Sequence, residues 1–294
     1  MLLPRKINMK KIREILKHPL YAGLLIASLV SLLFVISGEH EMLFTIPIAY
    51  YKHRGPSQPL ELLIQQLQHG EIQATNPYSY GYTILNDKCG NEDDPNDIVI
   101  IVKTSRKNFK RREAIRKAWG CKSFYKNISV VIVYMVGSSL KDGLQKRIVK
   151  ENEHHGDILQ GHFIDSYNNL TIKTQMGLHW LENQCDHFKY ALLVDDDTFI
   201  SPTNTINYLI DPDRYPSNSL INKNRTLSRG DEDMYAGCLM IKQPIRFRLS
   251  KWHVNTDDYP YDYYPPYLNG PFQIMSRFTI KKLYYASLFT DPYM

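Results

Sequence analysis

The sequence predicts an α/β protein with a mainly parallel central sheet, preceded by a transmembrane helix and a stem. Residues 20–37 form an uncharged apolar run that follows a basic N-terminal tail. Residues 38–95 carry clusters of Pro, Gly, Asn and Asp that interrupt longer elements. From residue 97 onward, short β-branched runs alternate with helical patterns, which is typical of strand–helix units that pair in parallel.

The apolar run from Leu20 to Ser37 has 18 residues and no charge, which is the lower end of the length that spans a bilayer. Six Lys and Arg residues precede it, and acidic Glu39 and Glu41 follow it, so we expect a cytoplasmic N-terminus. A cleaved signal peptide is the alternative, but the long basic lead and the lack of a small-x-small cleavage site count against it. We therefore predict a cytoplasmic tail at 1–19, a signal anchor at 20–37 and a stem at 38–95, with all residues after the anchor in a lumenal or extracellular space.

The net charge of this 294-residue chain is +6, and its length suggests one or two domains. The first 18 residues carry six cationic side chains against one anionic side chain, so the rest of the chain carries a net charge of only +1. A nucleic acid would find no broad basic surface, and we expect no such partner. The 21 Tyr residues suit sites for polar ring-shaped ligands, although a Tyr-rich surface is the simpler interpretation.

The cysteines and glycosylation sequons agree with a lumenal or extracellular location. All four cysteines follow the apolar run, and an even number fits two disulfides in one of three pairings. A cysteine metal site is the alternative, but the chain has no C-x-x-C pair. Three N-x-[ST] sequons make Asn127, Asn169 and Asn224 candidate glycosylation sites.

The body of the protein is predicted at residues 96–294. Its β-branched runs read as strands at 97–105, 129–137, 157–167 and 190–200. Helical patterns lie between them at 109–120, 139–156 and 170–185. The sequence contains neither a G-x-G-x-x-G motif nor a P-loop.

Three consecutive aspartates, Asp195, Asp196 and Asp197, follow the apolar run that begins at Tyr190. Ligands of open α/β sheets bind outside the carboxyl ends of strands, where these carboxylates are expected. Adjacent carboxylates repel one another near a core unless a cation compensates them. Oxygen ligands suit hard divalent metals, and such a metal would neutralise a diphosphate that the carboxylates alone would repel.

A solvated acidic turn is the simpler interpretation of three aspartates. The buried strand before them and the return to apolar Phe199 and Ile200 after them favour a site instead. A buried strand followed by D-x-D resembles the pattern of nucleotide-sugar glycosyltransferases of the GT-A fold. A metal-dependent phosphohydrolase or nuclease is the chemical alternative, but the anchor, the nearly neutral body and the sequons favour a transferase.

Three further segments resemble sequence blocks of the beta-1,3-galactosyltransferase family, glycosyltransferase family 31. They are RREAIRKAWG at 111–120, FIDSYNNLTIKT at 163–174 and YPPYLNGPFQIMSR at 264–277. With the aspartates, four blocks occur in the family's order over residues 97–280. The resemblance implies a single-pass type II Golgi membrane enzyme that uses a UDP-sugar and Mn²⁺. It further implies transfer of a hexose, galactose or N-acetylglucosamine, to a glycan of a glycoprotein or glycolipid in a β1,3 linkage with inversion.

The same resemblance assigns roles to individual residues. Asp197 and Asp195 would ligate the metal, Asp195 would also hold the ribose, and Asp196 would support the site. The other expected donor-site residues are Arg112, Arg116, Asp165 and Lys173. Arg116 could equally form a structural salt bridge.

The chain also departs from the family pattern. Leu268 stands where the tyrosine–proline block commonly has a cysteine, so we expect that family disulfide to be absent. The family's E-D-V-x-x-G block, which helps supply the general base, is not found before Met294, so we expect the C-terminal end of the catalytic domain to be missing. Asp231, Glu232 and Asp233 resemble a substitute but are interpreted as a loop, which leaves the base unnamed. The absent block keeps a second hypothesis open, a non-catalytic relative that acts as a chaperone or regulator of a glycosyltransferase.

Overall fold

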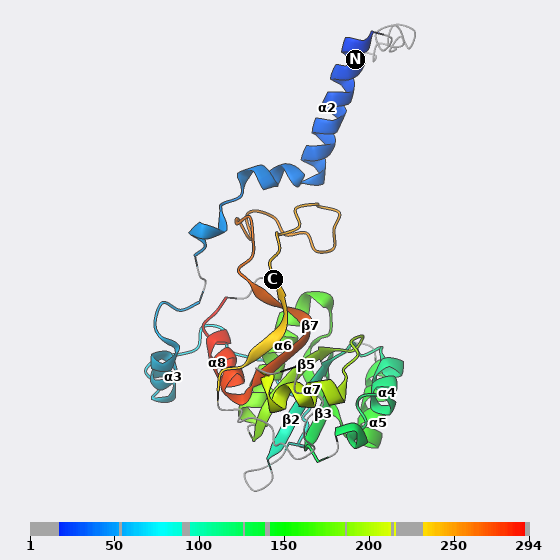
Figure 1. Cartoon of the computed structure of the whole chain (residues 1–294), viewed down its shortest axis with the longest axis vertical. Coiled ribbons are helices and arrows are strands. Elements are labelled where there is room, and N and C mark those ends of the chain that lie inside the picture. The colour runs from blue at the N-terminus through cyan, green and yellow to red at the C-terminus, as the bar shows by residue number, and fades with distance from the viewer. Residues whose placement is uncertain are drawn as a thin grey trace. The chain divides into compact units, whose positions relative to one another are not determined.

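The computed structural model describes residues 18–52, 55–89, 95–125, 127–138, 142–185, 187–212, 215 and 232–291. The chain divides into two compact units, which are described separately below. One unit comprises Met1–Lys52 and Ile241–Tyr267, and the other comprises His53–Met240 and Leu268–Met294 (Figure 1). The segment between β6 and β7 therefore groups with the N-terminal residues.

The larger unit is a mixed α/β domain, as the sequence predicts. Its strands are β1 (Tyr82–Ile84), β2 (Asn96–Lys103), β3 (Val130–Ser138), β4 (Ile158–Ile164), β5 (Phe188–Asp195), β6 (Tyr235–Met240) and β7 (Tyr267–Ser276, of which Tyr267 groups with the other unit). Its α-helices are α3 (Leu60–Gln68), α4 (Phe109–Lys117), α5 (Asp142–His155), α6 (Leu170–Asn183), α7 (Pro202–Ile210) and α8 (Arg277–Ser287). Short 3-10 turns lie at Lys122–Tyr125 and Tyr167–Asn169.

The seven strands form one sheet in the order β1-β4-β3-β2-β5-β7-β6. The central strands β4, β3, β2 and β5 pair in parallel, whereas β1 and β7 pair antiparallel to β4 and β5. The mainly parallel sheet is therefore confirmed, with an antiparallel partner on each side of the parallel core. The sequence pattern predicts strands 97–105 and 190–200 too long, since β2 ends at Lys103 and β5 ends at Asp195.

Helices cover both faces of the central strands, because β2 is apolar at every position from Ile98 to Val102 and fully buried there. Val99 and Ile101 face α6 and α8, where Trp180 is the largest core side chain. Ile98 and Ile100 face the opposite way and pack in a second cluster with residues of α4, α5 and α7 (Figure 1). The alternation of side chains along one strand thus builds two cores and fixes the sheet between them.

Local sequence signals explain where two of the covering helices begin. Ser201 precedes α7, and its side-chain oxygen accepts a hydrogen bond from the Asn204 backbone, with Pro202 at the first helical position. Ser276 caps α8 in the same way through the Thr279 backbone and ends β7 at the same residue. Each cap satisfies one backbone N–H that the first turn leaves without a helical partner.

The smaller unit contains α2 (Pro19–Ser37), two 3-10 helices at Glu39–Phe44 and Ile48–Tyr50, and the segment 241–267. Within the described residues, α2 is the one helix long and apolar enough to cross a membrane, with a mean hydropathy of 2.4. It fits the predicted signal anchor. Backbone bonds join the residues after α2 to the distant segment, since Ile46 N donates to Pro260 O at 2.8 Å and Asp262 N donates to Ile46 O at 2.9 Å. The stem and domain boundaries drawn from the sequence stay predictions.

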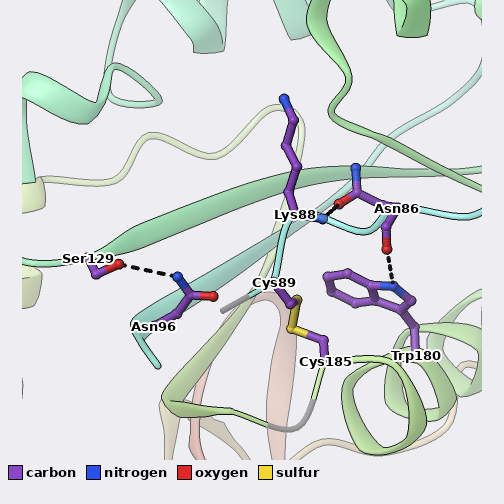
Figure 2. Close-up of a disulfide and its surroundings, with 7 residues drawn as sticks. All are labelled: Asn86, Lys88, Cys89, Asn96, Ser129, Trp180 and Cys185. Carbon is purple, nitrogen blue, oxygen red and sulfur yellow. Dashed lines mark hydrogen bonds between the residues drawn. A yellow bond between two sulfur atoms is a disulfide. The ribbon is translucent and has the colours of Figure 1, made fainter. Parts of the chain in front are cut away.

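One disulfide forms, between Cys89 and Cys185, with a Cα–Cα distance of 5.3 Å (Figure 2). It ties the segment before β2 to the end of α6, where the Trp180 indole also donates to the Asn86 carbonyl at 3.0 Å (Figure 2). The expectation of two disulfides is wrong, because Cys121 and Cys238 are free thiols. Cys238 lies in β6, which is three strand spacings of about 4.8 Å from β2 in the sheet. Cys121 follows α4, the helix that comes after β2. A disulfide needs the two Cα atoms within roughly 7 Å of each other.

Replacing Cys89 and Cys185 together with Ser should lower the free energy of unfolding by about 2–4 kcal/mol, because the bond closes a loop between residues 96 apart in sequence. Denaturant unfolding of the full chain in detergent measures this. Cys121→Ser is the matched control and should leave the midpoint unchanged. Equal midpoints for the parent and the double variant would show that the crosslink contributes no stability.

Candidate active site

A cleft of about 670 Å³ opens at the carboxyl ends of the parallel strands. Its lining comes from residues at or just after the ends of β2, β4 and β5, together with the start of α6 and one glycine of β7. The lining residues are Lys103, Thr104, Ser105, Asn108, Asp165, Ser166, Tyr167, Leu170, Thr171, Lys173, Thr174, Asp195, Asp196, Asp197 and Gly270. The cleft forms here because the carboxyl ends of neighbouring parallel strands meet at one edge of the sheet.

Asp195 ends β5 and lies in register with Lys103, which ends β2. Lys103 Nζ is 3.0 Å from Asp195 Oδ1 and donates to the Gly270 carbonyl at 2.7 Å. One cation therefore joins β2, β5 and β7 at the floor of the cleft. Lys103 is not among the residues predicted from the sequence, although its position at the end of a buried strand next to Thr104 indicates the same sheet edge as the aspartates.

Asp196 is the buried member of the aspartate run, with a side chain that is 7% exposed. Its carboxylate accepts hydrogen bonds from Thr104 Oγ1 at 2.5 Å, Asn108 Nδ2 at 2.7 Å and Arg111 at 2.6 Å. Burial alone would raise the pKa of Asp196, but these hydrogen bonds outweigh it and hold the pKa below its ordinary value. Asp196 is therefore ionised at neutral pH and holds the chain after β5 against the start of α4.

Asp197 lines the cleft, and its side chain is 65% exposed. Its contact with Arg111 is 3.3 Å long, and Asp195 is also partly exposed at 37%. The run of three thus divides into one buried carboxylate and two that face the cleft. Arg111 is the arginine of the 111–120 block that reaches the aspartates, and it is not among the site residues predicted from the sequence.

Asp165 and Lys173 form a buried ion pair on the other wall of the cleft. Lys173 Nζ lies 2.5 Å from Asp165 Oδ1 and donates to the Thr104 carbonyl at 2.9 Å. The other oxygen of Asp165 accepts from the Arg106 backbone at 3.2 Å. The pair joins the end of β4 to α6 and to the loop after β2, so the structure brings Asp165 and Lys173 to the same cleft as the three aspartates.

Arg112 and Arg116 are not among the residues that line the cleft. Glu151 accepts from the Arg112 guanidinium at 2.9 and 2.6 Å and from Arg116 at 2.9 Å. Asp157 accepts two hydrogen bonds of 2.8 Å from Arg116. The two guanidinium groups of α4 are therefore neutralised by the carboxylates of Glu151 on α5 and of Asp157 just after α5. The predicted contact of these arginines with a donor stays a prediction.

The carboxylates meet the requirements of one kind of metal site. Within the described parts of the chain, no three His, Cys, Asp or Glu side chains converge on a common point. Asp195 and Asp197 nevertheless offer two partly exposed oxygen donors beside one cleft. A hard divalent ion such as Mg²⁺ uses one or two carboxylates and takes further ligands from phosphates and water. The residues present fit that arrangement.

Neither Glu232 nor Asp233 lines the cleft, and Asp233 pairs with Lys282 at 2.8 Å. Asp231 lies outside the described residues. These contacts give no support for a base displaced into this segment. They agree with its interpretation as a loop.

The candidate glycosylation sites differ in accessibility. Asn127 is exposed, whereas Asn169 is half-buried and its side-chain nitrogen donates to the Ile164 carbonyl at 2.7 Å. Asn224 lies outside the described residues.

We expect Asn127→Gln to remove a glycan and Asn169→Gln to leave the glycan number unchanged, because the side-chain nitrogen of Asn169 already donates a hydrogen bond to the Ile164 carbonyl. Gel mobility before and after glycosidase treatment of the chain expressed in secretory cells measures both, and a mobility change in the Asn169 variant would contradict the assignment.

A mainly parallel α/β sheet with a cleft of paired acidic and basic side chains at its strand ends defines the class of open α/β proteins, which bind their ligands at this edge of the sheet. The family model described as Galactosyltransferase matches residues 110–294, so the chain belongs to the galactosyltransferase family.

Individual relatives agree with this family. The chain is 32% identical over 208 residues to "Beta-1,3-galactosyltransferase brn" of Drosophila melanogaster, covering 69% of this chain and 59% of that protein. It is 30% identical over 273 residues to "Beta-1,3-galactosyltransferase 1" of Mus musculus and of Homo sapiens, covering 90% of this chain and 79% of each relative. The matched region thus spans less than two thirds of the fly relative. Family membership supports glycosyl transfer as the general activity.

Proposed function

We propose that this protein transfers a hexose, galactose or N-acetylglucosamine, from a UDP-sugar to a glycan acceptor, forming a β1,3 linkage with inversion. As part of this proposal, we assign the larger unit to the GT-A fold. The names of the relatives, which are beta-1,3-galactosyltransferases, support galactose and the linkage. The acceptor is a glycan on a glycoprotein or glycolipid.

One observation carries the proposal: the three aspartates differ in burial and in hydrogen bonding. Asp196 is buried and hydrogen bonded on both oxygens, while Asp195 and Asp197 are left partly exposed at the mouth of one cleft. Lys103 and Lys173 lie on the lining beside them. A solvated acidic turn needs neither a buried carboxylate nor cations placed on both sides. A nucleoside diphosphate would bring further negative charge into this cleft, which the lining cations and a metal ion held by Asp195 and Asp197 would balance.

Mn²⁺ is the proposed cofactor, with Asp197 and Asp195 as the residues that would hold it. A bound divalent ion would neutralise the diphosphate and stabilise it as a leaving group. Lys103 fixes the Asp195 carboxylate, and Asp196 fixes the backbone between the two exposed carboxylates through Thr104 and Asn108. The buried Asp165–Lys173 pair keeps the opposite wall in place for the nucleoside. The proposal names no general base.

The location proposed for the enzyme is the Golgi membrane, with a type II topology. The exposed apolar helix α2 supports this, since none of its side chains is buried in the protein. The basic residues 1–17 that orient the anchor lie outside the described residues. The larger unit would then lie in the lumen.

A panel of UDP-sugars offered to simple glycan acceptors, with Mn²⁺ and with a chelator, tests the function. Transfer from one UDP-hexose that requires the metal and gives a β1,3 product is the expected result. UDP binding without transfer from any donor would favour the non-catalytic alternative, a chaperone or regulator of another glycosyltransferase. Failure to bind UDP under any condition would contradict both the donor site and the metal assignment.

A further inference from the structure

The loop Phe247–Trp252 in the smaller unit exposes large apolar side chains. Leu249 is 85% exposed, Trp252 is 55% exposed, and Phe247 is also exposed. Grouped apolar side chains on a protein surface mark a contact with another protein or with a membrane. The position of this loop within the smaller unit decides between a protein contact and a membrane contact.

The loop is hydrogen bonded to the end of the apolar helix α2. The Arg248 backbone donates to the carbonyl of Ser37, the last residue of that helix, at 2.7 Å. Gly38 follows with a φ of +86°, and a Cβ there would lie 2.7 Å from both the Arg246 carbonyl and the Arg248 side chain. Only a glycine lets the helix end and the loop approach so closely. The Arg248 guanidinium also pairs with Glu41 at 3.0 Å.

The base of the loop is held rigidly. Arg246 is buried and donates to the carbonyls of Val254, Tyr259 and Tyr261 at distances of 2.8, 2.6 and 3.0 Å. These hydrogen bonds join the residue just before the exposed loop to residues that follow it. The apolar side chains are therefore presented by a braced loop next to the helix end.

The helix sets the depth at which the loop lies. Its 19 residues extend about 28 Å at 1.5 Å per residue, close to the roughly 30 Å of a bilayer's hydrocarbon core. Placed as a span, α2 ends at the lumenal membrane interface, and the loop bonded to Ser37 lies at the same depth. Leu43 and Phe44, just after the helix, are also highly exposed at this end. Trp residues and cationic side chains are favoured in this layer of a membrane, and Lys251 Nζ lies 4.2 Å from the Trp252 ring centroid.

We propose that Phe247–Trp252, together with Leu43 and Phe44, is a second membrane contact that inserts into the lipid interface. The occupant of this surface is the bilayer itself rather than a protein partner. The chain would then meet the membrane at two places more than two hundred residues apart in sequence. This inference rests on the proposed signal anchor and is independent of the proposed sugar transfer.

Tryptophan fluorescence of the full chain in phosphatidylcholine vesicles tests the proposal. Trp119 and Trp180 are buried in the cores of the larger unit, so Trp252 is the exposed tryptophan. Lipids brominated near the headgroup should quench its emission more strongly than lipids brominated near the chain end. Trp252→Phe should abolish most of this quenching. Equal quenching of parent and variant, or no quenching in either, would overturn the proposal.

A charge placed at the tip gives a second measurement. Leu249→Asp should reduce the quenching of Trp252 by about half or more, because a carboxylate is unfavourable in the apolar part of the interface. Leu85→Asp, at another exposed leucine in the larger unit, is the matched control and should leave the quenching unchanged. An unchanged signal in the Leu249 variant would contradict the assignment.

Two parallel readouts separate the possible failures. Retention in vesicles after alkaline carbonate extraction tests the anchor, and UDP binding with Mn²⁺ in the same vesicles tests the proposed function. Retained protein without Trp252 quenching rejects the loop contact alone. Extracted protein rejects the anchor and with it the loop contact. Quenching without UDP binding leaves the loop contact standing and rejects the donor site.

Discussion

Asp197→Asn is expected to weaken UDP binding in the presence of Mn²⁺ by roughly 10- to 150-fold, which corresponds to the ~1.5–3 kcal/mol typical of interactions with a charged group. Asp197 is largely exposed and makes one long contact with Arg111, so its loss should leave the fold intact. With a chelator in place of the metal, the loss of affinity should disappear or change sign, because without the metal the Asp197 carboxylate only repels the diphosphate. Calorimetric titration of UDP under both conditions measures the two affinities.

The control for this experiment is Asp87→Asn, the same change at an exposed aspartate outside the cleft. It should leave both affinities unchanged. Equal affinities for the parent and the Asp197 variant with Mn²⁺, while both remain folded, would favour a solvated acidic turn. That outcome would remove the metal assignment without affecting family membership.

Glu151→Gln is expected to lower the free energy of unfolding by about 3–5 kcal/mol, the usual cost of breaking a buried ion pair by removing one partner. Glu151 is the shared acceptor of Arg112 and Arg116, and the Arg112 side chain is completely buried. The amide cannot supply the missing charge, which leaves Arg112 underpaired. Denaturant unfolding of the full chain in detergent, followed through buried Trp119 and Trp180, measures the change.

Glu153→Gln is the matched control, since Glu153 lies on the same helix α5 and is exposed. It should change the free energy of unfolding by less than about 0.5 kcal/mol. A similarly small effect for Glu151→Gln would contradict the structural role of the buried cluster. It would then favour the alternative in which these arginines serve the donor.

Acid should reduce the difference between the parent and Glu151→Gln. Burial by itself would raise the pKa of Glu151, but the hydrogen bonds from Arg112 and Arg116 outweigh it and lower the pKa. A carboxylate with a lowered pKa contributes stability above its unfolded pKa, about 4.3 for Glu, and loses it as the pH falls through its folded pKa. Repeating the unfolding series below about pH 4 therefore checks the sign of the effect.

The tertiary structure explains why the arginines of the 111–120 block were hard to assign from sequence. Arg111, Arg112 and Arg116 lie on one short helix, α4, yet they point to different surroundings. Arg111 reaches Asp196 and Asp197, whereas Arg112 and Arg116 pair with Glu151 and with Asp157. Sequence spacing shows which residues share a helix face, but it does not show which distant carboxylate meets that face.

The sequence by itself determined the features that depend on local pattern. The uncharged run at 20–37, the alternation of strands and helices and the position of Asp195–Asp197 at the end of a buried strand all follow from periodicity and composition over a few residues. These features were enough to predict the α/β class and the edge of the sheet where the cleft lies.

Only the tertiary structure decided the features that depend on long-range contacts. It inserts β7 antiparallel beside β5, pairs Cys89 with Cys185 and groups residues 241–267 with the end of α2. It also places Lys103 against Asp195 and buries Asp196 while leaving Asp197 exposed. Each outcome is set by which segments pack together and how much surface they bury, and this packing brings together residues whose separation along the chain carries no local signal.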